Sequence, residues 1–318
     1  MSIRQRRLDR PTLVGIAAIL LWSATIALAR SISERIGPAT AGAAVYLTGG
    51  VFLVGDLLAR GRSFGALRRL SLRYVLGCGT LFVLYTVGLF LGLGLAADRR
   101  QSIEVGLLNY LWPALTILFS LGLLGRRAGV GLIPGTLLAL GGVFLVLTQG
   151  AAISWGSFAK NLLSNPLAYG LGAFAAVTWA LYSNLTRRWG SSDSTGAVLL
   201  FTLSTGVAFL LLRALRPEAG VWGIRVAAEV AVLALATATA YVFWDVAMRE
   251  GDVVLVASCS YLTPFLSTVV SCLYLGVWPG LTLWLGCLLI IAGSILSWWS
   301  VRPPGPPKAE PALRHAGT

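Results

Sequence analysis

The sequence predicts an all-α integral membrane protein in which ten transmembrane helices form two inverted five-helix repeats around a central cavity. Of the 318 residues, 57% are hydrophobic and 12% are charged, about half the charged fraction of a typical soluble domain. Mean hydropathy is +0.80. Apolar segments of about 20 residues, long enough to cross a bilayer, follow one another with short polar or Gly/Pro breaks. One sequence pattern also occurs in both halves. Composition, segment length and repetition therefore predict the same architecture.

Ten apolar segments are the expected transmembrane helices. They cover residues 12–33, 39–59, 73–97, 103–124, 129–148, 166–187, 194–214, 226–248, 253–275 and 280–300. The connector between the fifth and sixth segments carries Phe158 and Leu162 on one helical face, which predicts a short helix at the membrane surface. We therefore divide the chain into an N-terminal segment (1–11), a first repeat (12–149), a connector (150–165), a second repeat (166–300) and a disordered tail (301–318).

The internal repeat rests on four matched points. Tyr110-Leu111-Trp112-Pro113 returns 151 residues later as Tyr261-Leu262-Thr263-Pro264. The same shift relates Gly142 to Gly293, and a shift of 157 residues relates Trp22 and Arg30 to Trp179 and Arg187. Because each repeat has an odd number of helices, the second must enter the membrane from the opposite face. The repeats are therefore predicted to be inverted in topology.

The distribution of basic residues predicts the orientation. If the N-terminus is cytoplasmic, 17 Lys and Arg residues fall on the inner side and 8 on the outer side. This bias satisfies the positive-inside rule. No cleavage site follows the first apolar segment, so we expect that helix to be retained. Both termini are then cytoplasmic, and the 150–165 connector is periplasmic.

Other classes of function lack the necessary residues. The net charge of +13 is spread over short patches between apolar segments, so the lipid bilayer and not nucleic acid explains it. The single histidine, His315, lies in the tail, and the four cysteines show no metal-ligand spacing. We therefore expect no catalytic residues, no metal and no cofactor. The protein is predicted not to be an enzyme.

Polar aromatic residues are predicted near the bilayer centre, where aromatic belts do not normally lie. Counting from the helix ends gives this depth to Trp22, Tyr85, Trp179 and Tyr241. Each carries an N–H or O–H group that needs a partner, which favours a partly wet cavity over simple packing of helices. Packing alone remains the alternative for any single member.

Two prolines occupy repeat-related positions at the same depth. Pro113 cannot donate a backbone hydrogen bond, so we expect a helix kink and a free carbonyl at Asn109; Pro264 has the same predicted effect at Ser260. Kinked helices near the midplane are typical of transporter binding sites. Carboxylates are absent from the predicted midplane, and Asp245 is expected to pair with Arg249 one turn later.

Taken together, these features resemble the drug/metabolite transporter superfamily of the ten-helix EamA type, over residues 12–300. Within it, the Trp22 and Tyr85 regions, Asn109-Tyr110-Leu111-Trp112-Pro113 and the Trp179 region are most similar to the YddG-type aromatic amino acid exporters of bacterial inner membranes. The resemblance implies export of aromatic and other amino acids by alternating access through a central hydrophobic cavity. We further expect a single chain to function as a monomer.

The candidate substrate-binding residues are aromatic or amide side chains near the midplane. They are Trp22, Tyr85, Asn109, Tyr110, Trp112, Trp179, Tyr182, Tyr241, Trp244 and Tyr261. On a continuous helix Asn109 and Trp112 share a face while Tyr110 points elsewhere, so we expect one of this stretch to pack against a neighbour. The alternative function is efflux of drugs or other small metabolites by a transporter of the same superfamily.

Overall fold

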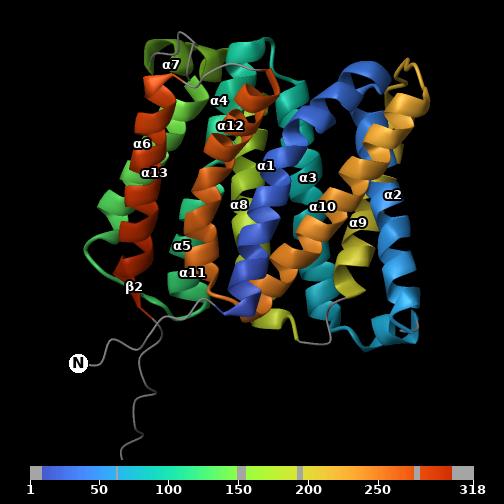
Figure 1. Cartoon of the computed structure of the whole chain (residues 1–318), viewed down its shortest axis with the longest axis horizontal. Coiled ribbons are helices and arrows are strands. Elements are labelled where there is room, and N and C mark those ends of the chain that lie inside the picture. The colour runs from blue at the N-terminus through green and yellow to red at the C-terminus, as the bar shows by residue number, and fades with distance from the viewer. Residues whose placement is uncertain (1–8, 62–63, 149–154, 192–195, 276–279, 303–318) are drawn as a thin grey trace, which may run out of the picture.

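A computed structural model describes residues 9–61, 64–148, 155–191, 196–275 and 280–302, and most of them are helical (Figure 1). α1 (Arg10–Ile36) begins at one end of the bundle, and α7 (Trp155–Ser164) lies at the opposite end. We call these the Arg10 end and the α7 end. α7 matches the short helix predicted for the connector. The predicted N-terminal segment up to residue 8 and the predicted tail from residue 303 lie outside the described residues.

The helices of the bundle lie between these two ends. In the first half they are α2 (Pro38–Ala59), α3 (Gly79–Gly94) with a preceding π-helical turn (Tyr74–Cys78), α4 (Arg99–Asn109), α5 (Trp112–Leu123) and α6 (Leu132–Thr148). In the second half they are α8 (Pro166–Trp189), α9 (Ala197–Leu215), α10 (Ile224–Glu250), α11 (Val253–Cys259), α12 (Thr263–Leu275) and α13 (Leu281–Ser300). Short 3-10 helices cover Phe64–Arg69 and Ser260–Leu262. The strands β1 (Arg127–Ala128) and β2 (Val301–Arg302) pair antiparallel at the Arg10 end.

Side-chain caps define where several helices begin. Asp9 accepts a hydrogen bond from the Thr12 N–H at 2.8 Å, and Asp98 accepts one from the Gln101 N–H at 2.8 Å. These side chains satisfy N–H groups that the first helical turn leaves without partners. α2 is capped from a distant part of the chain, because Glu218 accepts from the Thr40 N–H at 2.8 Å. The loop before α10 therefore fixes the start of α2.

Seven described segments are helical, long and apolar enough to cross a membrane. They are Pro38–Ala59, Tyr74–Gly94, Arg100–Leu123, Ala197–Leu215, Ile224–Glu250, Val253–Val270 and Leu281–Ser300. α6 and the first part of α1 are also apolar but shorter. α8 is long enough but less apolar, since it buries polar residues such as Ser183 and Asn184 inside the bundle. The chain is therefore an all-α integral membrane protein.

Four antiparallel helix pairs organise the bundle. α1 packs on α10, α2 on α9, α3 on α8, and α6 on α13. The last pair lies at one edge, and the pair of α2 with α9 lies at the other (Figure 1). α6 and α13 approach so closely that a Cβ atom built on Gly142 would lie 2.5 Å from the Gly286 carbonyl oxygen. Small residues permit such backbone contact between membrane helices.

A buried polar network holds the Arg10 end together. Arg249 Nε donates to Asp245 Oδ2 at 2.8 Å, and both side chains are almost fully buried. This confirms the predicted pair. The Tyr74 hydroxyl also donates to Asp245, and Arg249 Nη1 donates to the Ser191 carbonyl at 2.8 Å. The network joins α10 to the turn before α3 and to the residues that follow α8.

Candidate functional site

A cavity of about 510 Å³ lies between helices of both halves of the chain. Towards the α7 end it is lined by Ala29, Ser33 and Pro38, and at its deep end by Trp22 and Trp179. Its other walls come from α2, α3, α9, α10, the junction of α4 with α5, and the start of α12. Small-molecule sites typically enclose ~300–1,000 Å³. The cavity is therefore large enough for a metabolite of amino-acid size.

Trp22 of α1 forms part of the deep end of the cavity. Its ring centroid lies 5.8 Å from that of Trp179 and 5.6 Å from that of Tyr241, both in edge-on geometry. The ring of Trp244 is 5.3 Å away. Edge-on aromatic contacts of this kind are favourable beyond the burial of apolar area. The long pairing of α1 with α10 places Trp22 against this surface.

Trp179 of α8 lies at the centre of the aromatic cluster. Its ring centroid is 4.5 Å from that of Tyr85, 5.0 Å from that of Tyr182 and 6.3 Å from that of Trp112. The repeat-related residues Trp22 and Trp179 thus meet at the base of one cavity. α8 can place Trp179 there because the small residues Ala175, Ala176 and Ala180 let the neighbouring helices approach it.

Two tyrosine hydroxyls meet in the cavity wall. Tyr46 of α2 and Tyr241 of α10 are joined by a hydrogen bond of 2.8 Å between their hydroxyl oxygens. The Tyr241 ring also packs edge-on against buried Phe82, with the centroids 4.6 Å apart. Each hydroxyl thereby gains a partner that burial would otherwise deny it. The pair connects α2 and α10 across the deep end of the cavity.

The junction of α4 with α5 supplies another wall. α4 ends at Asn109 and α5 begins at Trp112. Because the helix stops at this point, the side chains of Asn109, Tyr110 and Trp112 all line the cavity. Tyr110 in addition packs against a buried cluster of residues from α6 and α13, which confirms that one member of this stretch packs against a neighbour. The Oδ1 atom of Asn109 is buried and has no hydrogen-bond partner among the described residues.

The polar groups of the cavity wall are uncharged wherever the structure describes them. None of the described residues that line it is Asp, Glu, Lys, Arg or His. Its polar groups are tyrosine, serine and threonine hydroxyls, indole N–H groups and the Asn109 amide. Such a wall suits a ligand with a large apolar part and a small polar part without net charge.

Both halves of the chain match the same protein family. The model of the EamA-like transporter family matches residues 10–148 and again residues 166–299. The chain belongs to the EamA-like transporter family. The two matched segments include nearly all of the residues that the structure of this EamA-like transporter describes.

Curated relatives of this EamA-like transporter carry a common name. The aromatic amino acid exporter YddG of Salmonella typhimurium is 35% identical over 295 residues, which cover 92% of this chain and 98% of the relative. The Escherichia coli protein of the same name is 34% identical with the same coverage. That of Ancylobacter novellus is 35% identical and covers 90% and 96%. The resemblance seen in the sequence is thereby confirmed.

A solved crystal structure gives the same result at the level of the fold. It shares 33% sequence identity with the EamA-like transporter described here and superimposes with a TM-score of 0.77. The match covers 92% of this chain and 98% of that chain. The arrangement of helices around the cavity therefore lies within a fold already seen in a crystal.

Most of the predicted site residues of the transporter come together. Those that line the cavity are Trp22, Tyr85, Asn109, Tyr110, Trp112, Trp179 and Tyr241. The three other predicted residues do not line the cavity. Tyr182 is fully buried with its ring 5.5 Å from that of Phe82, and the Trp244 indole N–H donates to Ser183 Oγ at 3.2 Å. Tyr261 is buried in a separate core cluster with residues of α6 and α13.

The predicted proline kinks are breaks in the helices. Pro113 lies in the first turn of α5, where its missing N–H group leaves no intrahelical bond unmade. Before Pro264 the chain forms a 3-10 turn, and the Thr263 N–H donates to the Ser260 carbonyl. The Ser260 carbonyl is therefore not free, contrary to the prediction. The chain avoids the clash of a mid-helix proline by ending one helix and starting another.

Several residues of the cavity wall are not among those predicted from the sequence. Tyr46, Thr86, Phe90, Phe209 and Thr237 line it as well. Tyr46 could have been found, because it lies within one turn of the middle of the predicted helix 39–59. The depth criterion that selected Tyr241 applies equally to its hydrogen-bond partner.

Proposed function

We propose that this protein exports amino acids, especially aromatic ones, across the bacterial inner membrane by alternating access. The observation that carries the proposal is the cavity itself, which has aromatic walls and no acidic or basic side chain among its described residues. A zwitterion with an indole or phenyl ring matches such a wall, since the ring can stack and the hydroxyls can hydrogen-bond the charged groups. The names of three relatives support the same substrate class.

We also propose that the chain forms ten transmembrane helices in two inverted repeats, with α4–α5 and α11–α12 each counted as one broken helix. Exchange of the two halves turns the pairing of α1 with α10 into that of α8 with α3, and it leaves the pairs α2–α9 and α6–α13 unchanged. Both breaks fall at repeat-related positions. These relations support a pseudo-two-fold axis through the cavity, the arrangement that lets one repeat rock against the other.

The proposed orientation has both termini in the cytoplasm and the connector 150–165 in the periplasm. Most of the described arginines lie at the Arg10 end, in agreement with the positive-inside rule. The cavity then extends towards the periplasm. We further propose that a monomer is functional, since the residues of a single chain line the whole cavity.

Reconstituted protein should carry out the proposed transport. Labelled tryptophan, phenylalanine and threonine should each be taken up into liposomes, and each amino acid should competitively inhibit the uptake of the other two. An imposed pH gradient should not change the rate, because the cavity wall offers no carboxylate or imidazole to carry a proton. If folded protein transported none of these amino acids, the proposal would fail and the efflux of drugs or other metabolites would become the better interpretation.

Replacement of Trp22 should weaken transport of aromatic substrates. We expect Trp22→Ala to lower kcat/KM for tryptophan about tenfold, since one aromatic contact contributes up to ~1.5 kcal/mol. Trp22→Phe should recover most of the loss. Trp299→Ala is the matched control, because Trp299 is exposed at the far end of α13. Unchanged transport in folded Trp22→Ala protein would remove Trp22 from the substrate path.

A further inference from the structure

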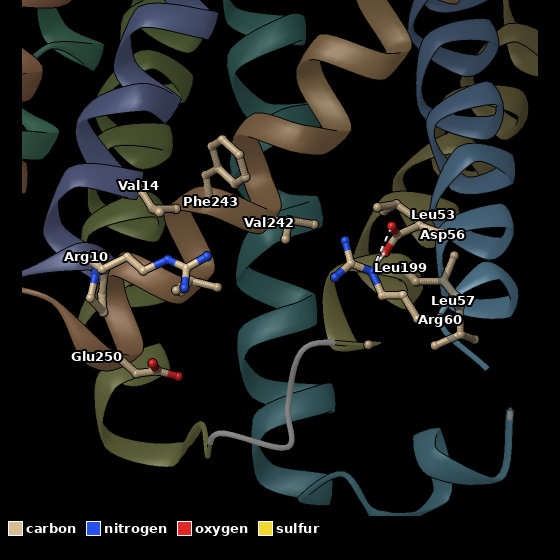
Figure 2. A pocket seen from close by; sticks show the side chains of 13 residues that line it. Arg10, Val14, Leu53, Asp56, Leu57, Arg60, Leu199, Val242, Phe243 and Glu250 are labelled. Carbon is tan, nitrogen blue, oxygen red and sulfur yellow. Dashed lines mark hydrogen bonds and ion pairs between the residues drawn. The ribbon is translucent and has the colours of Figure 1, made fainter. Parts of the chain in front are cut away.

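A second pocket lies at the Arg10 end of the bundle, opposite to the end reached by the central cavity (Figure 2). Its volume is about 460 Å³, and its walls come from α1, α2, α9 and α10. This volume is again within the ~300–1,000 Å³ that small-molecule sites enclose. None of its lining residues belongs to the set that lines the central cavity. The two are therefore separate sites.

The second pocket combines two positive and two negative side chains. Arg10 and Glu250 lie on one side of it, and Asp56 and Arg60 on the other (Figure 2). Asp56 and Arg60 neutralise each other through a contact of 2.8 Å. Among the described residues, in contrast, Arg10 makes no hydrogen bond or ion pair, and Glu250 accepts one hydrogen bond, from Arg249 at 3.1 Å. An unpaired guanidinium and an incompletely paired carboxylate thus remain available on one side.

Apolar side chains form the rest of this pocket. Leu53, Val242 and Phe243 also line it, and each lies further along its helix from the Arg10 end than the charged residues of the same helix (Figure 2). A ligand there would meet charges at the mouth and apolar surface further in. The four ionisable side chains have no net charge, so they favour a ligand that carries one charge of each sign and no excess.

The pocket and the central cavity are close neighbours along two helices. On α10, Tyr241 lines the cavity while the next two residues, Val242 and Phe243, line the pocket. On α2, Tyr46 lines the cavity and Leu53 lines the pocket. These two residues are seven positions apart, which is ~10 Å along a helix. The part of the cavity wall nearest to the pocket along these helices includes Tyr46 and Tyr241, whose hydroxyls are hydrogen-bonded to each other.

We propose that this pocket is a second substrate-binding site, where a zwitterionic amino acid with an apolar side chain is bound before it enters the central cavity. The substrate carboxylate pairs with the Arg10 guanidinium, and its ammonium group pairs with the Glu250 carboxylate. Its side chain lies against Phe243, Val242 and Leu53. This inference rests on the proposed function, and it assigns to the Arg10 end the loading of substrate from the cytoplasm.

Binding of labelled tryptophan to the full-length protein in nanodiscs tests the inference. Wild-type protein should bind two molecules per chain with different affinities. Arg10→Gln and Glu250→Gln should each raise the dissociation constant of one of the two sites about fivefold, the effect expected for an exposed ion pair, and leave the other unchanged. Arg188→Gln, which removes an exposed arginine outside both cavities, should change neither site.

Substrate analogues separate the charge interaction from a structural effect. Tryptamine has no carboxylate, so Arg10→Gln should not weaken its binding, whereas Glu250→Gln should. If wild-type protein binds one tryptophan, or if neither substitution changes either site, the inference is overturned while the proposed function stands. If wild-type protein neither binds nor transports tryptophan, the proposed function itself fails.

Discussion

Asp245→Ala is expected to be the most destabilising single substitution considered for this protein. It removes the buried carboxylate that pairs with the Arg249 guanidinium, which then keeps the half-exposed Glu250 as a partner, and it leaves the Tyr74 hydroxyl without this acceptor. Removing one member of a buried ion pair costs about 3–5 kcal/mol, because the remaining charge keeps its desolvation penalty. We expect the free energy of unfolding in detergent, measured by denaturant titration, to fall by that amount.

The chain contains a matched control for this substitution. Asp56 and Arg60 form an Asp–Arg pair with the same spacing and the same distance of 2.8 Å, but more than half of each side chain is exposed. Water screens an exposed pair, so Asp56→Ala should cost about 0–1 kcal/mol. If the two substitutions destabilised the protein equally, burial of the Asp245–Arg249 pair would not be the cause.

Gly142→Ala is expected to have the second largest effect. The added methyl group would lie 2.5 Å from the Gly286 carbonyl oxygen and 2.8 Å from the Ile290 amide nitrogen. These are main-chain atoms, which cannot move aside like a flexible side chain, so α6 and α13 must separate. Overpacking of this kind typically costs about 1–3 kcal/mol. A fall in the midpoint of thermal unfolding in detergent would measure it.

The neighbouring glycine provides the comparison. A Cβ atom on Gly141 meets nothing within 4 Å, and the residue is exposed on the outer face of α6. Gly141→Ala should therefore be neutral or stabilise the protein by about 0.4–1 kcal/mol, since alanine loses less backbone freedom on folding. Equal destabilisation by both substitutions would contradict the role assigned to the contact between α6 and α13.

The sequence predicts how deep a residue lies in the bundle, but it does not predict the direction in which the side chain points. Trp179 and Trp244 occupy similar depths, yet only Trp179 lines the cavity, because Trp244 is covered by other aromatic rings and bonded to Ser183. In a soluble helix the polar face would reveal the orientation. Here lipid surrounds the bundle and polar residues such as Ser183 and Asn184 are buried inside it, so contacts with other helices decide the orientation, and these cannot be read from spacing.

Interactions between residues that are close in the sequence could be predicted, because they do not depend on how the helices pack. The Asp245–Arg249 pair follows from a separation of one helical turn. Tyr74, which completes the network, lies 171 residues away from Asp245 in the chain, and its place depends on the packing of α3 against α8 and α9. Kinks were predicted at Pro113 and Pro264, close to the positions where the helices break. Their form depends on hydrogen bonds that the turn can make, which the presence of a proline alone does not specify.

The uncharged wall of the central cavity also determines how the membrane potential affects transport. Moving one elementary charge across a membrane at 100 mV involves ~2.3 kcal/mol. A zwitterion has no net charge, and no described acidic or basic side chain of the cavity would move with it. On the proposed function, the membrane voltage therefore neither drives nor opposes transport. Net export of an amino acid then occurs only while its concentration inside the cell exceeds its concentration outside. The protein would limit the accumulation of that amino acid in the cell.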